Sequence, residues 1–350
     1  MLFLKVKEHF DLKLPFVVYC KPNSNRLIAF LQRNDSLFEL ESTQSGFAFV
    51  SFDNKKRFCL PESHCDIIFE KAPTTSYIFG ATQSISINPE IQSAHQDLVA
   101  LGIQEIEKGT LKKVVLSRSE SIEVPQFDFE LSFLKLIQYY KSSFKYLFYH
   151  PKIGFWMGAT PEQFLKITNK TIQTVALAGT VLNTSSSPIQ WTAKEIEEQQ
   201  IVTDFIVNRL SKFSHQIEIS EPYNYEAGSL THIKTDIKAT LDTLDHIDSI
   251  LEEMHPTPAV CGFPKDEAKT FILNNEGYDR EFYAGFLGEW NKDFLSYKEG
   301  MSDLFVNLRC MKWEENTAKI FVGGGVNKGS NPQKEFTETV NKSQIMRKVL

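Results

Sequence analysis

The stretch KKVVLSR, residues 112–118, sets two lysines against an apolar run. The run at 114–116 predicts a β-strand, in which alternate side chains point to opposite faces. Lys113 would then share one face with Val115 and Ser117. A lysine that begins an edge strand reaches water past a buried stem, so on this stretch alone Lys113 is best explained as an edge residue.

The segments on either side of this strand mix helices and strands without a regular alternation. Apolar spacing predicts a helix over 87–108 that stops at Gly109, a second near 128–142, a third from Thr192 and a last one from Pro332. Further strands are predicted at FVVYC (16–20), LIAFLQ (27–32), GFAFVSF (46–52), YLFYH (146–150), GFWMG (154–158), FLKIT (164–168), TIQTVALAG (171–179), HQIEIS (215–220), DLFVNLRCMKW (303–313) and AKIFVGGG (318–325), with a loop at SSSP (185–188). This pattern favours an α+β fold over a doubly wound parallel sheet.

The composition is that of a globular protein with a large core. The chain has 350 residues, of which 42% are hydrophobic and 23% charged. Because no Pro/Gly/Ser linker or charge block divides it, we expect a single domain over 1–350, with a strand-rich N-terminal part at 1–90 and the chemically informative motifs in 91–350. The net charge of -6 argues against a nucleic-acid partner and favours a small molecule.

The cysteines and the N-terminus indicate a cytoplasmic protein. The five cysteines are odd in number and form no C-x-x-C pair, which argues against a disulfide framework or a zinc site. Charges interrupt the apolar residues of MLFLKVKEHFDLKLPF (1–16), so this segment does not resemble a signal peptide. Since no uncharged apolar run reaches the length of a membrane span, we expect no membrane association.

The predicted helix in TAKEIEEQQIVTDF (192–205) carries two glutamates beside apolar residues. Glu195 and Glu198 fall on one stripe with Val202, at spacings of three and four. Thr192 followed by Glu195 is a capping box, so Glu195 also has a purely structural explanation. Glu198 has no such explanation.

A second helix repeats this arrangement in NPQKEFTETVNKSQI (331–345), where Glu335 and Glu338 line one stripe. The alternative is a solvated face with a Glu338–Lys342 ion pair, worth only a few tenths of a kcal/mol. Two such pairs on separate helices provide the oxygen ligands that Mg²⁺ prefers. Spacing alone favours two solvated faces, because Glu-x-x-Glu is common in helices.

The stretch FVGGGVNKGS (321–330) leaves a strand and enters the last helix through glycines. Such a turn would let backbone N–H groups converge on an anion near a helix start. Glycine runs also occur in simple tight turns, and this one is not the spaced pattern of a dinucleotide or P-loop site.

Taken together, these stretches resemble the chorismate-utilising enzymes, which include isochorismate, salicylate, anthranilate and aminodeoxychorismate synthases. The matching stretches occur in the family's order: KVVLSR (113–118), GATPE (158–162), ALAGT (176–180), KEIEEQQIVTD (194–204), HPTPAVCGFP (255–264), YDREFYAGFLG (278–288), NLRC (307–310), GGGV (323–326) and EFTETVNK (335–342). Nine ordered matches are highly specific, although each alone is weak. The first ninety residues carry little of the resemblance.

The resemblance implies a fold and a metal site. The family has one domain with two large antiparallel β-sheets packed face to face, helices outside them, and a Mg²⁺-dependent site in a cleft between. The carboxylates that surround Mg²⁺ would be Glu195, Glu198, Glu335 and Glu338, with Glu198 and Glu338 as the direct ligands. Relatives often have histidine after the first-helix ligand, where this chain has Gln199.

The resemblance also implies a substrate site for chorismate. The metal would hold the ring carboxylate of chorismate. Arg309 and the backbone amides of Gly323, Gly324 and Gly325 would bind the pyruvyl carboxylate, with Lys342 near this anion, His255 near the leaving group and Thr180 positioning the ring.

In this family Lys113 has a specific meaning. Members that add ammonia usually have glutamine at this position, whereas members that add water have a lysine taken to be the general base. Aminodeoxychorismate synthases carry a nucleophilic lysine where this chain has Ala178. The resemblance therefore implies that Lys113 activates water for attack at C2 of chorismate while Glu162 protonates the departing C4 hydroxyl. A lysine acts as a base only without its proton, which an apolar strand face and a nearby Mg²⁺ would favour.

The sequence thus predicts an isochorismate synthase, with three alternatives. A salicylate synthase would go on to eliminate pyruvate in the same pocket. An ammonia-using subunit would bind a glutamine amidotransferase, a partner that Lys113 argues against. A non-catalytic chorismate-binding relative is disfavoured by the intact acid, base and metal carboxylates.

Overall fold

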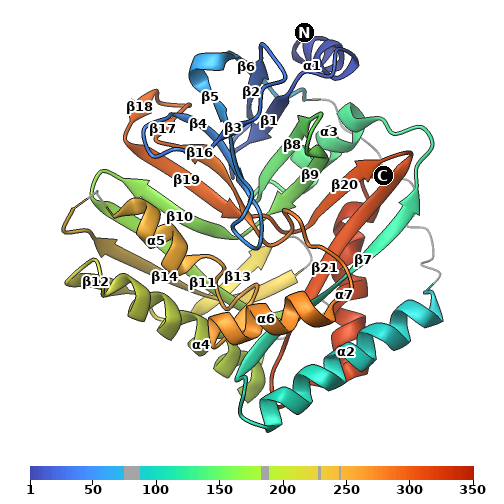
Figure 1. Cartoon of the computed structure of the whole chain (residues 1–350), viewed down its shortest axis with the longest axis vertical. Coiled ribbons are helices and arrows are strands. Elements are labelled where there is room, and N and C mark those ends of the chain that lie inside the picture. Colours follow the sequence, from blue (N-terminus) through green and yellow to red (C-terminus); the bar gives the residue numbers. More distant parts are fainter. Residues whose placement is uncertain (75–86, 183–188, 228–229, 244–245) are drawn as a thin grey trace.

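Two large antiparallel sheets pack face to face, with helices on the outside (Figure 1). The structure is a computed structural model that describes residues 1–74, 87–182, 189–227, 230–243 and 246–350. The fold is therefore the α+β arrangement of two packed sheets that the resemblance implied. The predicted loop at 185–188 lies outside the described residues.

The first sheet has the order β15 (Gly262–Phe263), β7 (Lys113–Glu123), β21 (Thr317–Val326), β20 (Cys310–Glu314), β9 (Gly154–Thr160), β8 (Phe144–His150), β1 (Phe16–Cys20), β2 (Arg26–Gln32) and β6 (Cys65–Lys71). The second has the order β12 (Gln216–Ile219), β14 (Leu230–Thr240), β11 (Thr171–Leu182), β10 (Gln163–Thr168), β19 (Met301–Val306), β16 (Phe286–Trp290), β4 (Gly46–Val50), β5 (Arg57–Pro61) and β3 (Phe38–Glu39), with β13 (Tyr223–Ala227) on β14. A small ribbon pairs β17 (Lys292–Asp293) with β18 (Lys298–Glu299). The helices are α1 (Leu2–Asp11), α2 (Pro89–Glu107), α3 (Phe129–Tyr139), α4 (Ala193–Leu210), α5 (Ile247–Met254), α6 (Lys265–Asn275) and α7 (Pro332–Arg347), and one 3₁₀ turn spans Glu62–His64.

Strand β1 shows how the core forms, because both of its faces are covered. Val17 and Tyr19 belong to the core between the two sheets, where the Tyr19 ring lies 5.2 Å from that of Phe47. Phe16 and Val18 point the other way, into a second core with residues of α1 and α3. A strand buried on both faces needs no polar residues, which explains the run FVVYC.

Strand β7 is internal, which excludes the alternative that Lys113 begins an edge strand and is in keeping with the buried amine that the resemblance implied. It lies between β15 and β21, with Lys113 opposite Phe263, and the Lys113 side chain is fully buried. The predicted alternation holds, because Val114 and Leu116 face Gly102 of α2 while Val115 faces the cleft described below. Lys113 thus shares a face with Val115.

Two chain connections and two helices contribute residues to the region between the sheets, and Figure 1 shows where these elements lie. The chain crosses from β9 to β10 at Pro161–Glu162, and it returns from β19 to β20 through residues 307–309. Helix α4 packs on β11 and β14, and α7 packs on β21 and α2. Central strands of both sheets therefore deliver polar residues to one place.

Two local predictions fail. Residues 2–11 form a helix in a region predicted to be strand-rich, because Leu2, Phe3 and Val6 pack into the second core. The run Gly323–Gly325 lies inside β21, and the turn to α7 is made by 327–331 instead. The predicted helices at 87–108, near 128–142, from Thr192 and from Pro332 correspond to α2, α3, α4 and α7.

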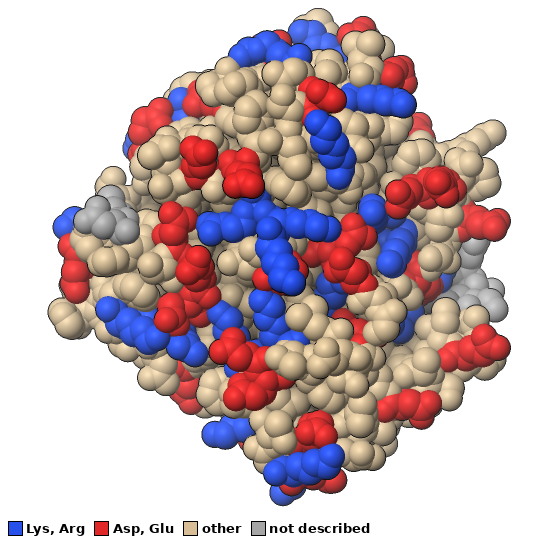
Figure 2. Space-filling model, viewed as in Figure 1, with Lys and Arg blue, Asp and Glu red and all other residues tan. Residues whose placement is uncertain are grey.

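The surface carries both signs of charge. Figure 2 shows basic and acidic side chains interspersed over the face in view. Within the described residues, no helix combines the length and apolar character needed to cross a membrane.

Candidate active site

A cleft between the sheets collects most of the predicted site residues. Its lining comes from both sheets and from helices α4 and α7. The lining residues are Val115, Pro161, Glu162, Leu177, Ala178, Gly179, Thr180, Glu198, His232, Ala259, Val260, Tyr283, Leu308, Arg309, Phe321, Val322, Gly323, Gly324, Gly325, Glu338 and Lys342.

Glu162 lies in the crossover between the sheets. It follows β9 directly, its N–H donates to Thr160 Oγ1 at 3.3 Å, and its carbonyl accepts from Val306 N–H at 3.0 Å. Only 5% of the residue is exposed. Burial raises the pKa of Glu162 to about 7, and the lysine at 113 and Arg309 oppose this rise. A carboxyl group with this pKa can carry a proton at neutral pH, as a general acid must.

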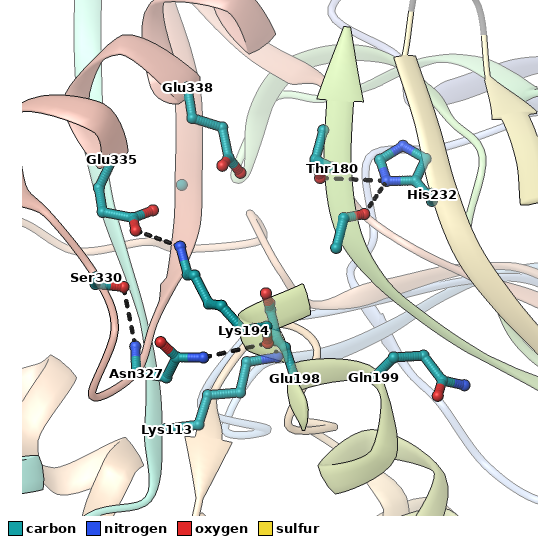
Figure 3. A network of polar contacts seen from close by, with 12 residues as sticks. Lys113, Thr180, Lys194, Glu198, Gln199, His232, Asn327, Ser330, Glu335 and Glu338 are labelled. Atoms are coloured by element: carbon teal, nitrogen blue, oxygen red, sulfur yellow. Dashed lines mark hydrogen bonds and ion pairs between the residues drawn. The ribbon is translucent and has the colours of Figure 1, made fainter. Parts of the chain in front are cut away.

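Three lysines pair with Glu198 of α4 and with Glu335 and Glu338 of α7, and Figure 3 shows two of these lysines, Lys113 and Lys194. Lys113 Nζ lies 3.0 Å from Glu198 Oε1, and Lys342 Nζ lies 2.7 Å from Glu338 Oε1. Lys194 pairs with Glu335 Oε1. Glu198, Glu335 and Glu338 therefore each contact a different lysine.

The pKa values of two of these acids shift in opposite directions. Burial alone would raise the pKa of Glu198, but Lys113, followed by two further lysines, holds it below its usual value. Burial raises the pKa of Glu335, Lys194 lowers it and Glu338 raises it, so that the net shift is upward. Burial lowers the pKa of Lys194, but Glu335 and the other two carboxylates of the cluster raise it more.

The carboxylates fit a divalent cation in their chemistry. Glu335 is 2% exposed, and its Oε2 finds no hydrogen-bond partner within the described residues. A Cβ on Gly324 would lie 3.6 Å from both Glu335 Oε2 and Glu338 Oε1, so the two acids flank an open space above β21. With the side chains as they stand, no group of three His, Cys, Asp or Glu in the described part of the chain could hold a metal ion.

The glycines of β21 line the cleft and leave space in it, because they have no side chains. A Cβ on Gly325 would lie 2.2 Å from Glu198 Oε1 and 3.2 Å from Lys113 Cε. Gly324 pairs with Leu116 in the ladder, whereas the N–H of Val115, opposite Gly325, donates to the carbonyl of Cys261, just before β15. The N–H groups of Gly323 and Gly325 therefore point away from β7, toward the side where β20 has ended. Two of the three predicted amides can thus face an anion.

Arg309 is held by a histidine. Its Nη2 lies 2.9 Å from His232 Nε2, and His232 Nδ1 lies 2.9 Å from the carbonyl of Gly179. Because a carbonyl only accepts and a guanidinium only donates, Nδ1 carries the proton and Nε2 accepts. Burial, with Arg309 next, lowers the pKa of His232 to about 3, so the ring stays neutral. Thr180 Oγ1 lies 3.2 Å from the same Nδ1, beside a bulge in β11.

Comparison with known proteins decides the family. A model described as "Chorismate binding enzyme" matches residues 65–350, which is most of the chain. The chain belongs to the chorismate-binding enzymes. Isochorismate synthase DhbC of Bacillus subtilis is 30% identical over 289 residues, which cover 76% of this chain and 70% of the relative. Isochorismate synthase MenF of Escherichia coli is 28% identical over 266 residues, which cover 72% of this chain and 59% of the relative, less than two thirds of its length.

Solved structures share the fold of this chorismate-binding enzyme. A putative 2,3-dihydroxybenzoate-specific isochorismate synthase, DhbC of Bacillus anthracis, has a TM-score of 0.78 at 23% identity and covers 96% of both chains. Anthranilate synthase component I of Streptococcus pneumoniae has a TM-score of 0.68 at 18% identity, covering 95% of this chain and 90% of its own. At these identities the likeness concerns the fold alone.

Four predicted site residues do not line the cleft of this chorismate-binding enzyme: Lys113 and Glu335 lie next to its lining residues Glu198 and Gly324, whereas Glu195 and His255 lie elsewhere. Glu195 completes the capping box of α4, its carboxylate accepting from Thr192 N–H at 3.0 Å, so it serves the helix start and does not line the cleft. His255 is packed against Phe164 and Phe286, with its Nε2 3.1 Å from the carbonyl of Ser51. Its predicted place near the leaving group is wrong, because its ring is enclosed by the core between the sheets.

Sequence reasoning missed three residues of the site. His232 sits in SLTHIKT, where a single histidine in a strand gives no local signal. Tyr283 lines the cleft and lay inside the quoted match YDREFYAGFLG without an assigned role. Lys194 directly precedes Glu195, and its partner on α7 is 141 residues away. Gln199 bonds Thr235 on β14 rather than the acidic cluster.

Proposed function

We propose that this chain is an isochorismate synthase, which converts chorismate to isochorismate by adding water at C2 and releasing the C4 hydroxyl. One observation carries the proposal. The buried Lys113 contacts Glu198, which lines the cleft, and Glu162, a carboxyl group whose pKa lies near neutrality, lines the same cleft. Water addition with loss of hydroxide needs this combination of a base and an acid.

Lys113 is the proposed base. It takes a proton from the attacking water, and the ammonium that forms has its counter-charge at Glu198, 3.0 Å away. The double bonds of the ring shift as the new C2–O bond forms. Glu162 gives its proton to the C4 hydroxyl, which leaves as water, so the reaction is an isomerisation with no net gain of atoms.

The remaining cations orient the substrate. Chorismate carries two carboxylates, and Arg309, which lines the cleft and contacts His232, provides a half-buried guanidinium for one of them. Glu198, Glu335 and Glu338 would hold Mg²⁺, which would supply positive charge for the ring carboxylate. Lys342 Nζ lies 2.7 Å from Glu338 Oε1 and donates to the carbonyl of Gly323 at 3.0 Å. It therefore links the acidic cluster to β21.

Salicylate synthase remains the second candidate, because the same cleft could also release pyruvate from isochorismate. A further relative, from Pseudomonas aeruginosa, is named a salicylate biosynthesis isochorismate synthase and is 33% identical over 204 residues. An ammonia-using subunit is disfavoured by Lys113, and Ala178 in the lining of the cleft leaves no amine for a covalent route at that position.

Product analysis tests the proposal. The purified chain is incubated with chorismate and Mg²⁺, with and without ammonium, and the products are separated by liquid chromatography. We expect isochorismate in both reactions and none when EDTA is present. Salicylate with pyruvate would favour the second candidate, and anthranilate or aminodeoxychorismate formed from ammonium would overturn the assignment of Lys113.

A further inference from the structure

Lys194 is placed where a lysine is unfavourable for its own helix. It is the second residue of α4, and the positive end of the helix dipole at this terminus disfavours a cation. Its side chain nevertheless crosses to α7, where the ammonium pairs with Glu335 Oε1 (Figure 3). Its carbonyl accepts from Asn327 Nδ2 at 3.3 Å, which ties the start of α4 to the turn before α7.

The ammonium of Lys194 lies within the field of the whole acidic cluster. Glu335 is its direct partner, and Glu198 and Glu338 also act on it. Like-charged carboxylates brought together need a cation between them. In the described structure Lys194 is the cation that links α4 to an acid of α7, through its pair with Glu335.

Of the three lysines at the cluster, Lys194 is the one free to move away. Lys113 is fully buried on β7, and Lys342 is held by a second bond to Gly323 O. The side chain of Lys194 is 22% exposed at the start of a helix, so it can turn toward solvent.

We propose that the Lys194 ammonium is an internal counter-ion that holds the acidic cluster together without metal and is displaced when a divalent cation binds. This inference rests on the metal site of the proposed function. An ammonium and a divalent cation cannot both contact Glu335 Oε1 without repulsion, so Lys194 competes with the metal. It also keeps α4 and α7 in register when the metal is absent.

Metal titration of the Lys194→Gln variant tests the competition without chorismate. Binding of Mn²⁺ is measured by calorimetry and by electron paramagnetic resonance. Loss of a charge-assisted hydrogen bond to Glu335 should tighten binding by roughly tenfold relative to wild type. Lys312→Gln is the matched control, because Lys312 pairs with Glu281 at 3.0 Å and is 15% exposed but lies outside the cluster; its affinity should not change.

Thermal unfolding in two conditions separates this role from a structural one. In EDTA, Lys194→Gln should melt below wild type, since the acids have lost a cation; with saturating Mn²⁺ the two proteins should melt together. Equal Mn²⁺ affinity in wild type and variant overturns the inference while leaving the metal site standing. An equal deficit in melting temperature in both conditions also overturns it. If neither protein binds Mn²⁺, both the metal site and the inference fail.

Discussion

At the scale of single residues, the chemistry depends on burying charge beside charge. Lys113 has no solvent exposure, and a buried ammonium is tolerated only with a nearby anion, which Glu198 supplies at 3.0 Å. Among the residues that the structure describes, none forms such a close ion pair with Glu162, and burial raises its pKa to about 7. Lys113 thus has a counter-ion at contact distance, whereas burial governs the pKa of Glu162.

Replacing Lys113 by glutamine should remove water addition. The amide cannot take a proton from water, so we expect isochorismate formation to fall by about 10²–10⁴-fold, the usual contribution of a positioned base. Chorismate consumption measured in a coupled assay, with circular dichroism to check folding, gives the result. Lys312→Gln is a control outside the cleft that should keep wild-type activity. Undiminished turnover by a folded Lys113→Gln protein would refute the assignment.

Glu162→Gln should separate activity from stability. Folding raises the pKa of Glu162 from 4.5 to about 7, so the wild type loses stability as pH rises through this window. The amide stays neutral, and the variant should be more stable than wild type at pH 8 by up to about 3 kcal/mol but equal to it near pH 4. Urea unfolding at both pH values measures the difference.

The activity of Glu162→Gln completes this test. The variant should be nearly inactive at every pH, while wild-type kcat/KM falls on the alkaline side with an apparent pKa near 7, as the acid loses its proton. A variant that keeps its turnover, or one no more stable than wild type at pH 8, would place the acid elsewhere.

At the residue level, motifs in the sequence could name residues that line the cleft, whereas residues that matter through a distant contact were missed. Glu162, Thr180 and Arg309 line the cleft as predicted. His255 was misplaced because the sequence does not show which histidine faces the cleft. His232 is revealed only by its contact with Arg309, across 77 residues of chain.

At the scale of elements, β21 and the helices α4 and α7 together position the acidic cluster. The glycines of β21 lack side chains, so the carboxylates of α4 and α7 can lie directly over the strand. Glycine weakens a strand interior and usually indicates a close approach of other groups. A run of glycines is typical of a turn, which is why the sequence predicted one at Gly323–Gly325. Here the run lies in a strand, because the carboxylates of α4 and α7 occupy the space that side chains would fill.

Gly325→Ala tests whether the missing side chains of β21 are needed to position the acidic cluster. The new methyl group would lie 2.2 Å from Glu198 Oε1 and 3.2 Å from Lys113 Cε, so both side chains must shift. We expect a folded protein with at least about a hundredfold lower kcat, since small misplacements of catalytic groups cost this much. Gly324→Ala is the comparison, because its methyl would stay 3.6 Å from the nearest oxygens and leave the Lys113–Glu198 pair in place.

Gly324→Ala and Gly325→Ala should affect different kinetic properties. Gly324→Ala should raise the metal concentration needed for activity, because its methyl enters the space between Glu335 and Glu338. Gly325→Ala should lower kcat at saturating metal. Steady-state kinetics over a range of Mg²⁺ concentrations distinguishes the two, and equal behaviour would show that the glycines do not separate the base from the metal acids.

Element prediction worked where the hydrophobic period was long. Helices α2 and α4 span 19 and 18 residues and were predicted from their spacing and caps. Helix α1 has 10 residues and buries only three, so it depends on packing against the first sheet. The order of strands within the two sheets was not derivable from periodicity, since long-range pairing leaves no local signal.

At the scale of the whole molecule, the two sheets are joined by polar groups as well as by the core. Tyr19 and Lys21, from the β1 side, meet Glu289 of β16 in the other sheet. Tyr19 Oη donates to Glu289 Oε1 at 2.6 Å, and Lys21 Nζ lies 2.5 Å from Glu289 Oε2. Glu289 is fully buried, and burial raises its pKa to about 7 although Lys21 opposes this.

Lys21→Met should therefore weaken the whole fold. Removing one partner leaves Glu289 buried without its cation, which typically costs about 3–5 kcal/mol. The loss should grow as pH rises from 5 to 8, because the unpaired carboxyl group must hold its proton to stay buried. Urea unfolding followed by fluorescence measures it. Lys7→Met is the control, since the Lys7–Glu130 pair is exposed by 47% and 31% and should cost less than about 1 kcal/mol.

The double variant Lys21→Met/Glu289→Gln completes the cycle. With a neutral amide in place of the acid, most of the lost stability should return, and the pH dependence should disappear. This outcome would locate the cost in the unpaired charge between the sheets. If Lys21→Met alone unfolds like wild type, or if the double variant is no more stable than the single one, the sheets are held by their apolar core and the network contributes nothing measurable.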